Sequence, residues 1–174
     1  ISFDPKLRLD HAHGQSLADW IDLRGGTLQR FPDGVAMPTT LKEIEEVLKF
    51  AADQDAVVIP YGGGTSVVGH LEVPVTEKPV LSLSLERFNR PIYIDSNNRM
   101  AAFEAGIRGP QLERELNSRG FTLGHFPQSF EYSTLGGWVV TRSSGQQSKH
   151  YGRIEALFAG GEVLTPQGPL SMPP

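Results

Sequence analysis

Cysteine is absent from the 174 residues, which excludes disulfides, thiolate zinc sites and a cysteine nucleophile. No apolar run approaches the roughly 20 residues that a membrane-spanning helix needs, and the opening stretch Ile1–Pro5 does not resemble a signal peptide. Lys and Arg number 16 against 20 Asp and Glu, so nucleic acids and anionic membranes are not the expected partners. With no targeting address visible, the expected compartment is the cytoplasm, and the lack of an initial methionine indicates a piece of a longer protein.

The short motifs of several large enzyme classes are also missing. Gly64 is followed by Thr65 rather than by the Gly-Lys-Ser/Thr of a Walker A loop, and neither Gly-x-Gly-x-x-Gly nor Gly-x-Ser-x-Gly occurs. His11 and His13 suit metal ligands, but no third ligand stands at a motif spacing. Glu104 has no second carboxylate at a diagnostic spacing. The sequence therefore predicts no catalytic and no metal-binding residues within this chain.

The most distinctive stretch present is a glycine loop that follows a β-branched run, Val57–Ile59. The run predicts a buried strand, and three adjacent glycines let backbone N–H groups form a concave nest for an anion such as phosphate. The alternative is a plain turn, although one glycine would serve a turn and each glycine costs about 1 kcal/mol of backbone entropy. The loop consists of Pro60, Tyr61, Gly62, Gly63, Gly64, Thr65 and Ser66.

Two strands and a helix are predicted around this loop. Val35–Pro38 predicts a short strand, and the capping box Thr40–Glu43 starts a helix that leads into the strand at 56–59. This predicts a right-handed parallel βαβ unit, with the glycines at the carboxyl end of a strand, where open sheets bind ligands. Val80–Leu85 alternates apolar and polar residues, which predicts a further strand with one solvent-exposed face.

A second, more antiparallel lobe is predicted from the following residues. Ile92–Asp95 and Met100–Ala105 predict a hairpin, and a helix is expected from Gly109 to Gly120. Phe121–Leu123 predicts a short strand, and residues 154–170 predict two strands joined by a turn at 166–168.

The second unusual region is Gly124–Gly152, which is dense in hydroxyl groups and glycines. Loops of this length in compact domains are usually functional or disordered, and Trp138 and Tyr151 argue against disorder. Ser133 is predicted to cap a short helix whose small residues allow close approach of a ligand. The alternative is a polar, irregular connection.

Four motifs occur in the order found in the flavin-binding domain of the vanillyl-alcohol oxidase / p-cresol methylhydroxylase superfamily. They are Ile59–Ser66, Glu104-Ala105-Gly106, Pro127-Gln128-Ser129 and Thr134-Leu135-Gly136-Gly137. Within that superfamily the chain most resembles the alkyldihydroxyacetonephosphate synthases and their bacterial relatives. Further stretches carry this resemblance: Ala12-His13-Gly14, Phe31-Pro32-Asp33, Ser129–Trp138, Thr141–Gly145 and Tyr151–Glu155.

The resemblance implies an α+β, two-subdomain PCMH-type FAD-binding fold. An N-terminal arm (1–34) would precede a βαβ subdomain (35–90) and a more antiparallel subdomain (91–174), with the substrate cap outside the chain. It implies non-covalent FAD, because members with covalently linked flavin carry His where Thr65 stands. The loop at 60–66 would bind the pyrophosphate. Gln128, where the family commonly has Asp, would line the ribityl and isoalloxazine side together with Pro127, Ser129, Ser133, Thr134, Gly136, Gly137, Thr141, Arg142 and Ser143.

The implied function is that of the FAD-binding part of a flavoenzyme. In the synthase subgroup an alkyl group replaces the acyl group of a dihydroxyacetone phosphate ester through flavin N5. The alternatives are an FAD-linked oxidase or dehydrogenase of a 2-hydroxy acid and a non-catalytic nucleotide-binding module. The small-molecule substrate would bind through the cap, and a homodimer of the full-length enzyme is expected.

Overall fold

The computed structural model describes residues 1–173. The chain divides into two compact units: unit 1 comprises Ile1–Arg87 with Leu164–Gly168, and unit 2 comprises Phe88–Val163 with the residues after Gly168. Helices and strands occur in both units, which confirms the predicted α+β class. Within residues 1–173, no helix combines the length and apolar character needed to cross a membrane.

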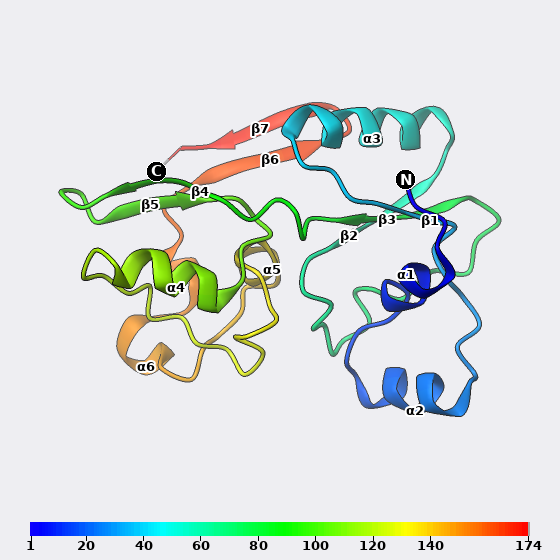
Figure 1. Ribbon diagram of the computed structural model, residues 1–174, viewed down its shortest axis with the longest axis horizontal. Helices are drawn as coiled ribbons and strands as arrows, with labels where there is room; N and C mark the ends of the chain where they lie inside the picture. The colour runs from blue at the N-terminus through cyan, green and yellow to red at the C-terminus, as the bar shows by residue number, and fades with distance from the viewer. Residues whose placement is uncertain (174) are drawn as a thin grey trace. The chain divides into compact units, whose positions relative to one another are not determined.

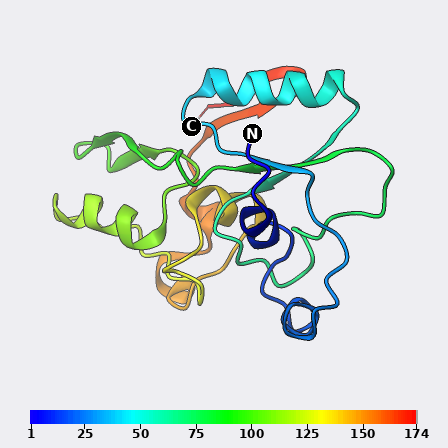
Figure 2. The ribbon, with the colours of Figure 1, turned by 45° about the vertical axis from the view of Figure 1, so that its right-hand side comes forward.

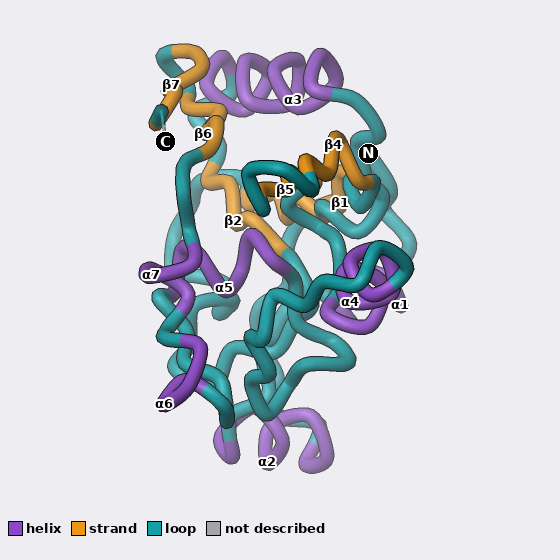
Figure 3. The backbone as a smooth tube through the Cα atoms, turned by 90° about the vertical axis from the view of Figure 1, so that its left-hand side faces the viewer, coloured by secondary structure: helices purple, strands orange, loops and turns teal. Residues whose placement is uncertain are grey.

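Unit 1 is built on a three-stranded parallel sheet. Strands β1 (Gly34–Ala36), β2 (Val57–Tyr61) and β3 (Val80–Ser84) lie in the order β1-β3-β2. Helix α3 (Leu41–Asp53) connects β1 to β2, so the predicted parallel βαβ unit is confirmed, with β3 inserted between its two strands. Helices α3 and α1 (Pro5–Asp10) lie on opposite sides of this sheet (Figures 1 and 3).

Helix α3 begins where the sequence predicts, but its capping contacts differ in part. The Thr40 hydroxyl accepts a hydrogen bond from the Glu43 backbone N–H at 3.2 Å, as expected for an N-cap. The Glu43 carboxylate reaches back to the backbone N–H and hydroxyl of Thr39. Ile44 and Ala51 are buried, because the apolar residues recur on one face of the helix.

The prediction of a solvent-exposed face on β3 is wrong. All five residues of β3 are buried, including Ser82 and Ser84. A central strand of a parallel sheet is covered on both faces by the connections of its neighbours. Serine is small enough to fit beneath such a cover, so the alternation of Leu and Ser marked side-chain size rather than exposure to water.

The N-terminal arm contains two helices. Helix α2 (Leu17–Gly25) starts with a complete capping box between Ser16 and Asp19. Helix α1 is not predicted from the sequence. Its signals are Asp4, whose carboxylate accepts from the Leu7 N–H, and Pro5 in the first turn.

Unit 2 starts with the predicted hairpin of β4 (Pro91–Asp95) and β5 (Met100–Phe103), which pair antiparallel. Helix α4 (Gly109–Asn117) runs beside this hairpin (Figure 2). Leu112 and Leu116 on α4 are buried in the core of unit 2, as their helical spacing predicts.

Three short helices follow in unit 2: α5 (Leu135–Thr141), α6 (Ser148–Tyr151) and α7 (Ile154–Leu157). Strands β6 (Gly161–Thr165) and β7 (Gly168–Met172) then pair in a two-stranded sheet around the predicted turn. The prediction of a strand from Ile154 is wrong for residues 154–157, which form α7.

The predicted strand at Phe121–Leu123 is also wrong, because this segment is irregular. The buried carboxylate of Glu113 accepts hydrogen bonds from the Leu123 N–H at 3.0 Å and from the Thr122 hydroxyl at 2.8 Å. A side chain from α4 thus satisfies polar groups that a strand would satisfy through a neighbouring strand.

Candidate functional site

The predicted cofactor residues fall into two sets, one in each unit. Pro60–Ser66 belong to unit 1, and Pro127–Ser143 belong to unit 2. The first set runs from the end of β2 into the loop that follows it, and the second runs from the turn before α5 through α5 to its C-cap.

In unit 1, the glycine loop leaves β2 at its carboxyl end. Gly64 is buried and has a φ of +68°, a conformation that disfavours residues with a Cβ. A Cβ at Gly64 would also overlap the hydroxyl of Tyr61. Only glycine therefore fits at position 64, because its backbone lies directly against the Tyr61 side chain. A simple turn does not require such a close contact.

The hydroxyl residues of the loop differ in their use. The Ser66 hydroxyl oxygen accepts from the backbone N–H groups of Val68 and His70, at 3.4 Å each, and so helps to shape the turn. Thr65 is half-buried, and its hydroxyl has no hydrogen-bond partner among residues 1–173. The Thr65 hydroxyl is therefore the side-chain donor that this loop offers to a ligand, beside its backbone N–H groups.

In unit 2, the cap of α5 is displaced by one residue from the prediction. Thr134, not Ser133, is the N-cap, and its hydroxyl accepts from the Gly137 N–H at 3.3 Å. Ser133 is buried, and its hydroxyl donates to the Ser129 carbonyl and accepts from the Trp138 indole N–H at 2.7 Å. The Ser133 hydroxyl thus connects the turn before α5 to the core.

The turn before α5 is closed by its own backbone. The Pro127 carbonyl accepts from the Phe130 N–H at 3.0 Å, and the Ser129 carbonyl accepts from the Tyr132 N–H at 2.9 Å. Gln128 is exposed, whereas Pro127 and Ser129 are half-buried. The Gln128 side chain is thus the accessible polar group of this turn.

Two glycines allow α5 to approach its neighbours closely. The Gly136 N–H donates to the Ala105 carbonyl at 2.8 Å, and a Cβ at Gly136 would lie 2.7 Å from that of Ala105. A Cβ at Gly137 would lie 3.2 Å from the Thr134 hydroxyl oxygen. These contacts place Glu104-Ala105-Gly106 and Thr134–Gly137, two of the sequence motifs, directly against each other.

The end of α5 carries three more predicted residues. The exposed Thr141 donates its hydroxyl to the Gly137 carbonyl at 2.7 Å. Arg142 adopts a left-handed φ of +53° as the C-cap, and its guanidinium lies 3.4 Å from the Glu155 carboxylate. The exposed Arg142 side chain is thus held by an ion pair on the surface, which contributes little to stability.

Ser143 has a partner that is not predicted from the sequence. The Nε2 atom of the buried His125 lies 2.7 Å from the Ser143 hydroxyl. Burial lowers the pKa of His125, so its ring is neutral at pH 7. No sequence signal pairs His125 with Ser143, which lies 18 residues further along the chain.

Glu104 also has a partner, 14 residues away. Its buried carboxylate accepts from the guanidinium Nη2 of Arg90 at 2.8 Å and from the Arg90 backbone N–H at 2.7 Å. Burial opposes ionisation of Glu104, but the hydrogen bonds from Arg90 outweigh it and lower the pKa of the carboxyl group. The pair therefore fixes β5 to the start of β4 rather than serving as an acid or base.

Two buried histidines should make the free energy of unfolding depend on pH. Burial lowers the pKa of His11, against the opposing carboxylates of Asp10 and Glu86, and that of His125, against Glu155. Below pH 6.5 the unfolded chain binds protons that the folded chain does not, so the free energy of unfolding falls as the pH drops. We expect each histidine to contribute at most about 1.4 kcal/mol per pH unit.

Denaturant titrations between pH 7 and pH 5 measure this effect. His11→Asn and His125→Gln, which keep a hydrogen-bonding amide, should flatten the pH dependence when combined. His70→Gln, at an exposed histidine, is the control and should leave the slope as it is. An unaltered slope in the double variant would contradict the assignment.

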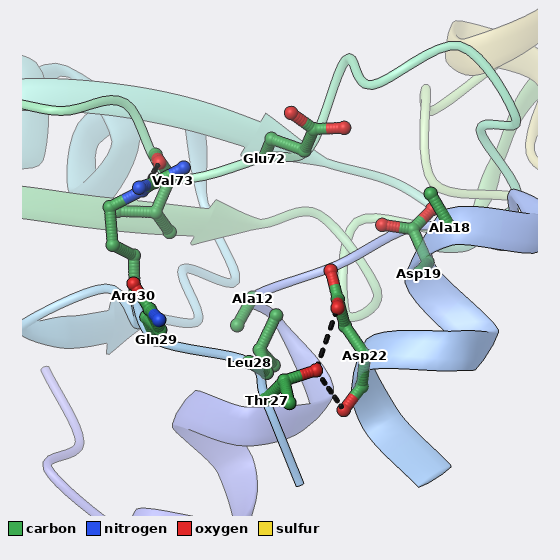
Figure 4. Close-up of a pocket in the computed structure, with 10 residues that line it drawn as sticks. All are labelled: Ala12, Ala18, Asp19, Asp22, Thr27, Leu28, Gln29, Arg30, Glu72 and Val73. Carbon is green, nitrogen blue, oxygen red and sulfur yellow. Dashed lines mark hydrogen bonds between the residues drawn. The ribbon is translucent and has the colours of Figure 1, made fainter. Parts of the chain in front are cut away.

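A pocket of about 450 Å³ lies in unit 1 between α2 and the segment at Glu72–Val73 (Figure 4). Two of its polar side chains have partners: the Thr27 hydroxyl donates to the Asp22 carboxylate at 2.7 Å, and the Arg30 Nε donates to the Val73 carbonyl at 2.8 Å. Among residues 1–173, no three His, Cys, Asp or Glu side chains are grouped to hold a metal ion.

Comparison with known proteins adds a family match and close relatives. The family described as FAD binding domain matches residues 32–171. An alkyldihydroxyacetonephosphate synthase from Caenorhabditis elegans is 43% identical over 171 residues, which cover 97% of this chain and 29% of that protein. One from Dictyostelium discoideum is 40% identical over 170 residues, which cover 97% of this chain and 28% of that protein.

The fold has a similarly close match. A solved structure of an alkyldihydroxyacetonephosphate synthase superimposes with a TM-score of 0.94 and 38% identity, covering 98% of this chain and 32% of that one. The chain thus spans less than a third of the length of the relatives it matches.

Proposed function

Because this chain belongs to the FAD binding domain family, we propose that it holds FAD non-covalently through the loop Pro60–Ser66 and the segment Pro127–Ser143. Family membership confirms the predicted cofactor, and the similarity of fold confirms the predicted PCMH-type architecture. We propose the identity of the residues that bind FAD and the absence of a covalent bond between FAD and the protein. Units 1 and 2 would supply the two FAD-binding subdomains.

The single observation that carries the proposal is the backbone at Gly64. Its left-handed φ and its approach to Tyr61 hold the loop in one conformation after a parallel strand. A run of glycine amides in that position suits an anionic diphosphate, because no Cβ obstructs the N–H groups. The Thr65 hydroxyl adds a donor, and as a threonine it offers no nitrogen for a covalent bond to flavin.

The second set fits the uncharged part of FAD. Gln128 offers an exposed amide, and Thr141 offers an exposed hydroxyl. Ser143 is oriented by the neutral His125, whose ring is buried against Trp138 with 5.0 Å between ring centroids. Neutral donors and acceptors of this kind suit ribityl hydroxyls and the polar edge of a flavin ring.

The longer protein containing this chain is proposed to be a flavoenzyme of the alkyldihydroxyacetonephosphate synthase kind. The relatives that support this share 40% and 43% identity with the chain. When bound, FAD supplies the flavin ring whose N5 is the reactive atom. Within this chain the residues bind and orient the cofactor, and the substrate-binding groups would lie in the rest of the protein.

Addition of FAD to the purified protein is expected to give a flavin absorbance spectrum shifted from that of free FAD, saturating near one FAD per chain. Denaturation followed by ultrafiltration should release all the flavin into the filtrate, because binding is non-covalent. Saturation by FAD supports the proposal, and a spectrum identical to that of free FAD would overturn it. Flavin retained with the denatured chain would overturn the non-covalent assignment alone.

Activity is tested on the full-length protein. Exchange of the acyl group of a dihydroxyacetone phosphate ester for a fatty alcohol is the expected reaction. Turnover of a 2-hydroxy acid instead would establish the oxidase or dehydrogenase alternative, and absence of either with bound FAD would favour a non-catalytic module.

A further inference from the structure

The segment Asp10–Gln15, which we call the strap, lies outside the residues that match the FAD binding domain family. It connects α1 to α2 in unit 1. His11, Ala12 and Gly14 within it are buried although residues 11–15 form no helix or strand. Its buried position raises the question of what it packs against.

One end of the strap holds the beginning of the glycine loop. The Tyr61 hydroxyl donates to the Asp10 carbonyl at 3.1 Å. The His11 ring lies against the Tyr61 ring, with 4.0 Å between the ring centroids and 37° between the planes. Because the Tyr61 hydroxyl occupies the space beside Gly64, fixing Tyr61 also fixes the backbone in the middle of the loop.

The other end of the strap holds the end of the glycine loop. The Gln15 N–H donates to the Ser66 carbonyl at 2.7 Å. Gly14 lies so close that a Cβ on it would overlap this same carbonyl oxygen. The strap therefore touches Tyr61 and Ser66, which are five residues apart and enclose the three glycines.

His11 is suited to this role because it stays uncharged. Its Nδ1 donates to the Leu7 carbonyl at 2.8 Å, and its buried Nε2 has no hydrogen-bond partner among residues 1–173. A neutral ring packs on the Tyr61 ring without the desolvation cost of a buried positive charge.

We propose that the strap Asp10–Gln15 is a positioning segment of the cofactor site, which holds the glycine loop ready for the diphosphate of FAD before the cofactor arrives. This inference rests on the proposed function. Fixing a loop in its bound conformation raises affinity because less order has to be imposed on binding. The gain in affinity applies to ligands that contain the diphosphate and not to ligands that lack it.

The test compares FAD with riboflavin, which has the flavin ring and ribityl chain but no phosphate. Gly14→Ala should raise the Kd for FAD about tenfold and leave the Kd for riboflavin unchanged, because its Cβ separates the strap from Ser66. Gly25→Ala is the matched control in the same arm: its Cβ would lie 3.6 Å from the nearest atom, an ordinary contact. Titrations of flavin fluorescence, with circular dichroism to verify folding, measure both constants.

Tyr61→Phe is the second variant, because it removes the hydroxyl that donates to Asp10 and keeps the ring against His11. It should raise the Kd for FAD by about fivefold, again without effect on riboflavin. If Gly14→Ala does not fold, Tyr61→Phe alone tests the proposed role of the strap.

Unchanged FAD affinity in the folded variants would overturn only the proposed role of the strap. Equal losses of affinity for FAD and riboflavin would do the same. Absence of FAD binding by the unmodified protein would overturn the proposed function, and this inference with it.

Discussion

Gly64→Ala is expected to weaken FAD binding by roughly 30- to 150-fold, which corresponds to about 2–3 kcal/mol. Alanine at a φ of +68° costs about 1–2 kcal/mol. Its Cβ would also displace the Tyr61 hydroxyl and break its hydrogen bond to Asp10, which is worth about 1 kcal/mol. The loop would relax into another conformation, and FAD binding would have to reverse that change.

Gly26→Ala provides a matched control for this variant. Gly26 has a φ of +67°, and a Cβ there would have no neighbour within 4 Å. The two variants therefore share the backbone penalty and differ in the overlap with Tyr61. Gly26→Ala should lower the free energy of unfolding by about 1–2 kcal/mol and leave the Kd for FAD within about twofold. Equal losses of FAD affinity in both variants would refute a specific role for Gly64.

Trp138→Ala is expected to have the largest effect on stability, a loss of about 3–5 kcal/mol in the free energy of unfolding. Trp138 is 2% exposed and packs in the core of unit 2 with Leu112 and Ile154. Its indole N–H donates to the Ser133 hydroxyl, which would lose this partner. Because Trp138 anchors α5, FAD affinity should fall as well. Urea titration followed by circular dichroism measures the loss.

Trp20→Ala is the control, since the chain has two tryptophans. Trp20 is 41% exposed, with the Arg24 guanidinium 5.1 Å from its ring centre. Its replacement should cost less than about 1 kcal/mol. Each variant retains one tryptophan, so fluorescence reports on unit 1 in one case and unit 2 in the other. A loss for Trp138→Ala as small as that for Trp20→Ala would contradict the packing described for α5.

Local chemistry in the sequence determined the elements that carry the site. The β-branched run before three glycines indicated β2 and its loop, and a Thr–Glu pair indicated the start of α3. The spacing of Leu112 and Leu116 indicated α4. In each case a preference within a few residues, such as backbone freedom, capping or helical period, agrees with the final fold, so no distant partner is needed to recognise it.

Local sequence patterns do not predict features that depend on contacts between residues far apart in the chain. The Glu113 carboxylate accepts from the Leu123 N–H, which a neighbouring strand would otherwise bind if Phe121–Leu123 were a strand. The His125 ring and the Ser143 hydroxyl form a hydrogen bond although they are 18 residues apart. The covered position of β3 depends on its two neighbours in the sheet.

The identity of the fold and the cofactor was determined by the sequence by itself, through its glycine loop and the order of its motifs. Only the tertiary structure decided how the loop is held: by Tyr61 against His11, and by Gly14 and Gln15 against Ser66. These contacts join residues about 50 positions apart. No short-range preference encodes them, because they arise when α1 and β2 pack in the same unit.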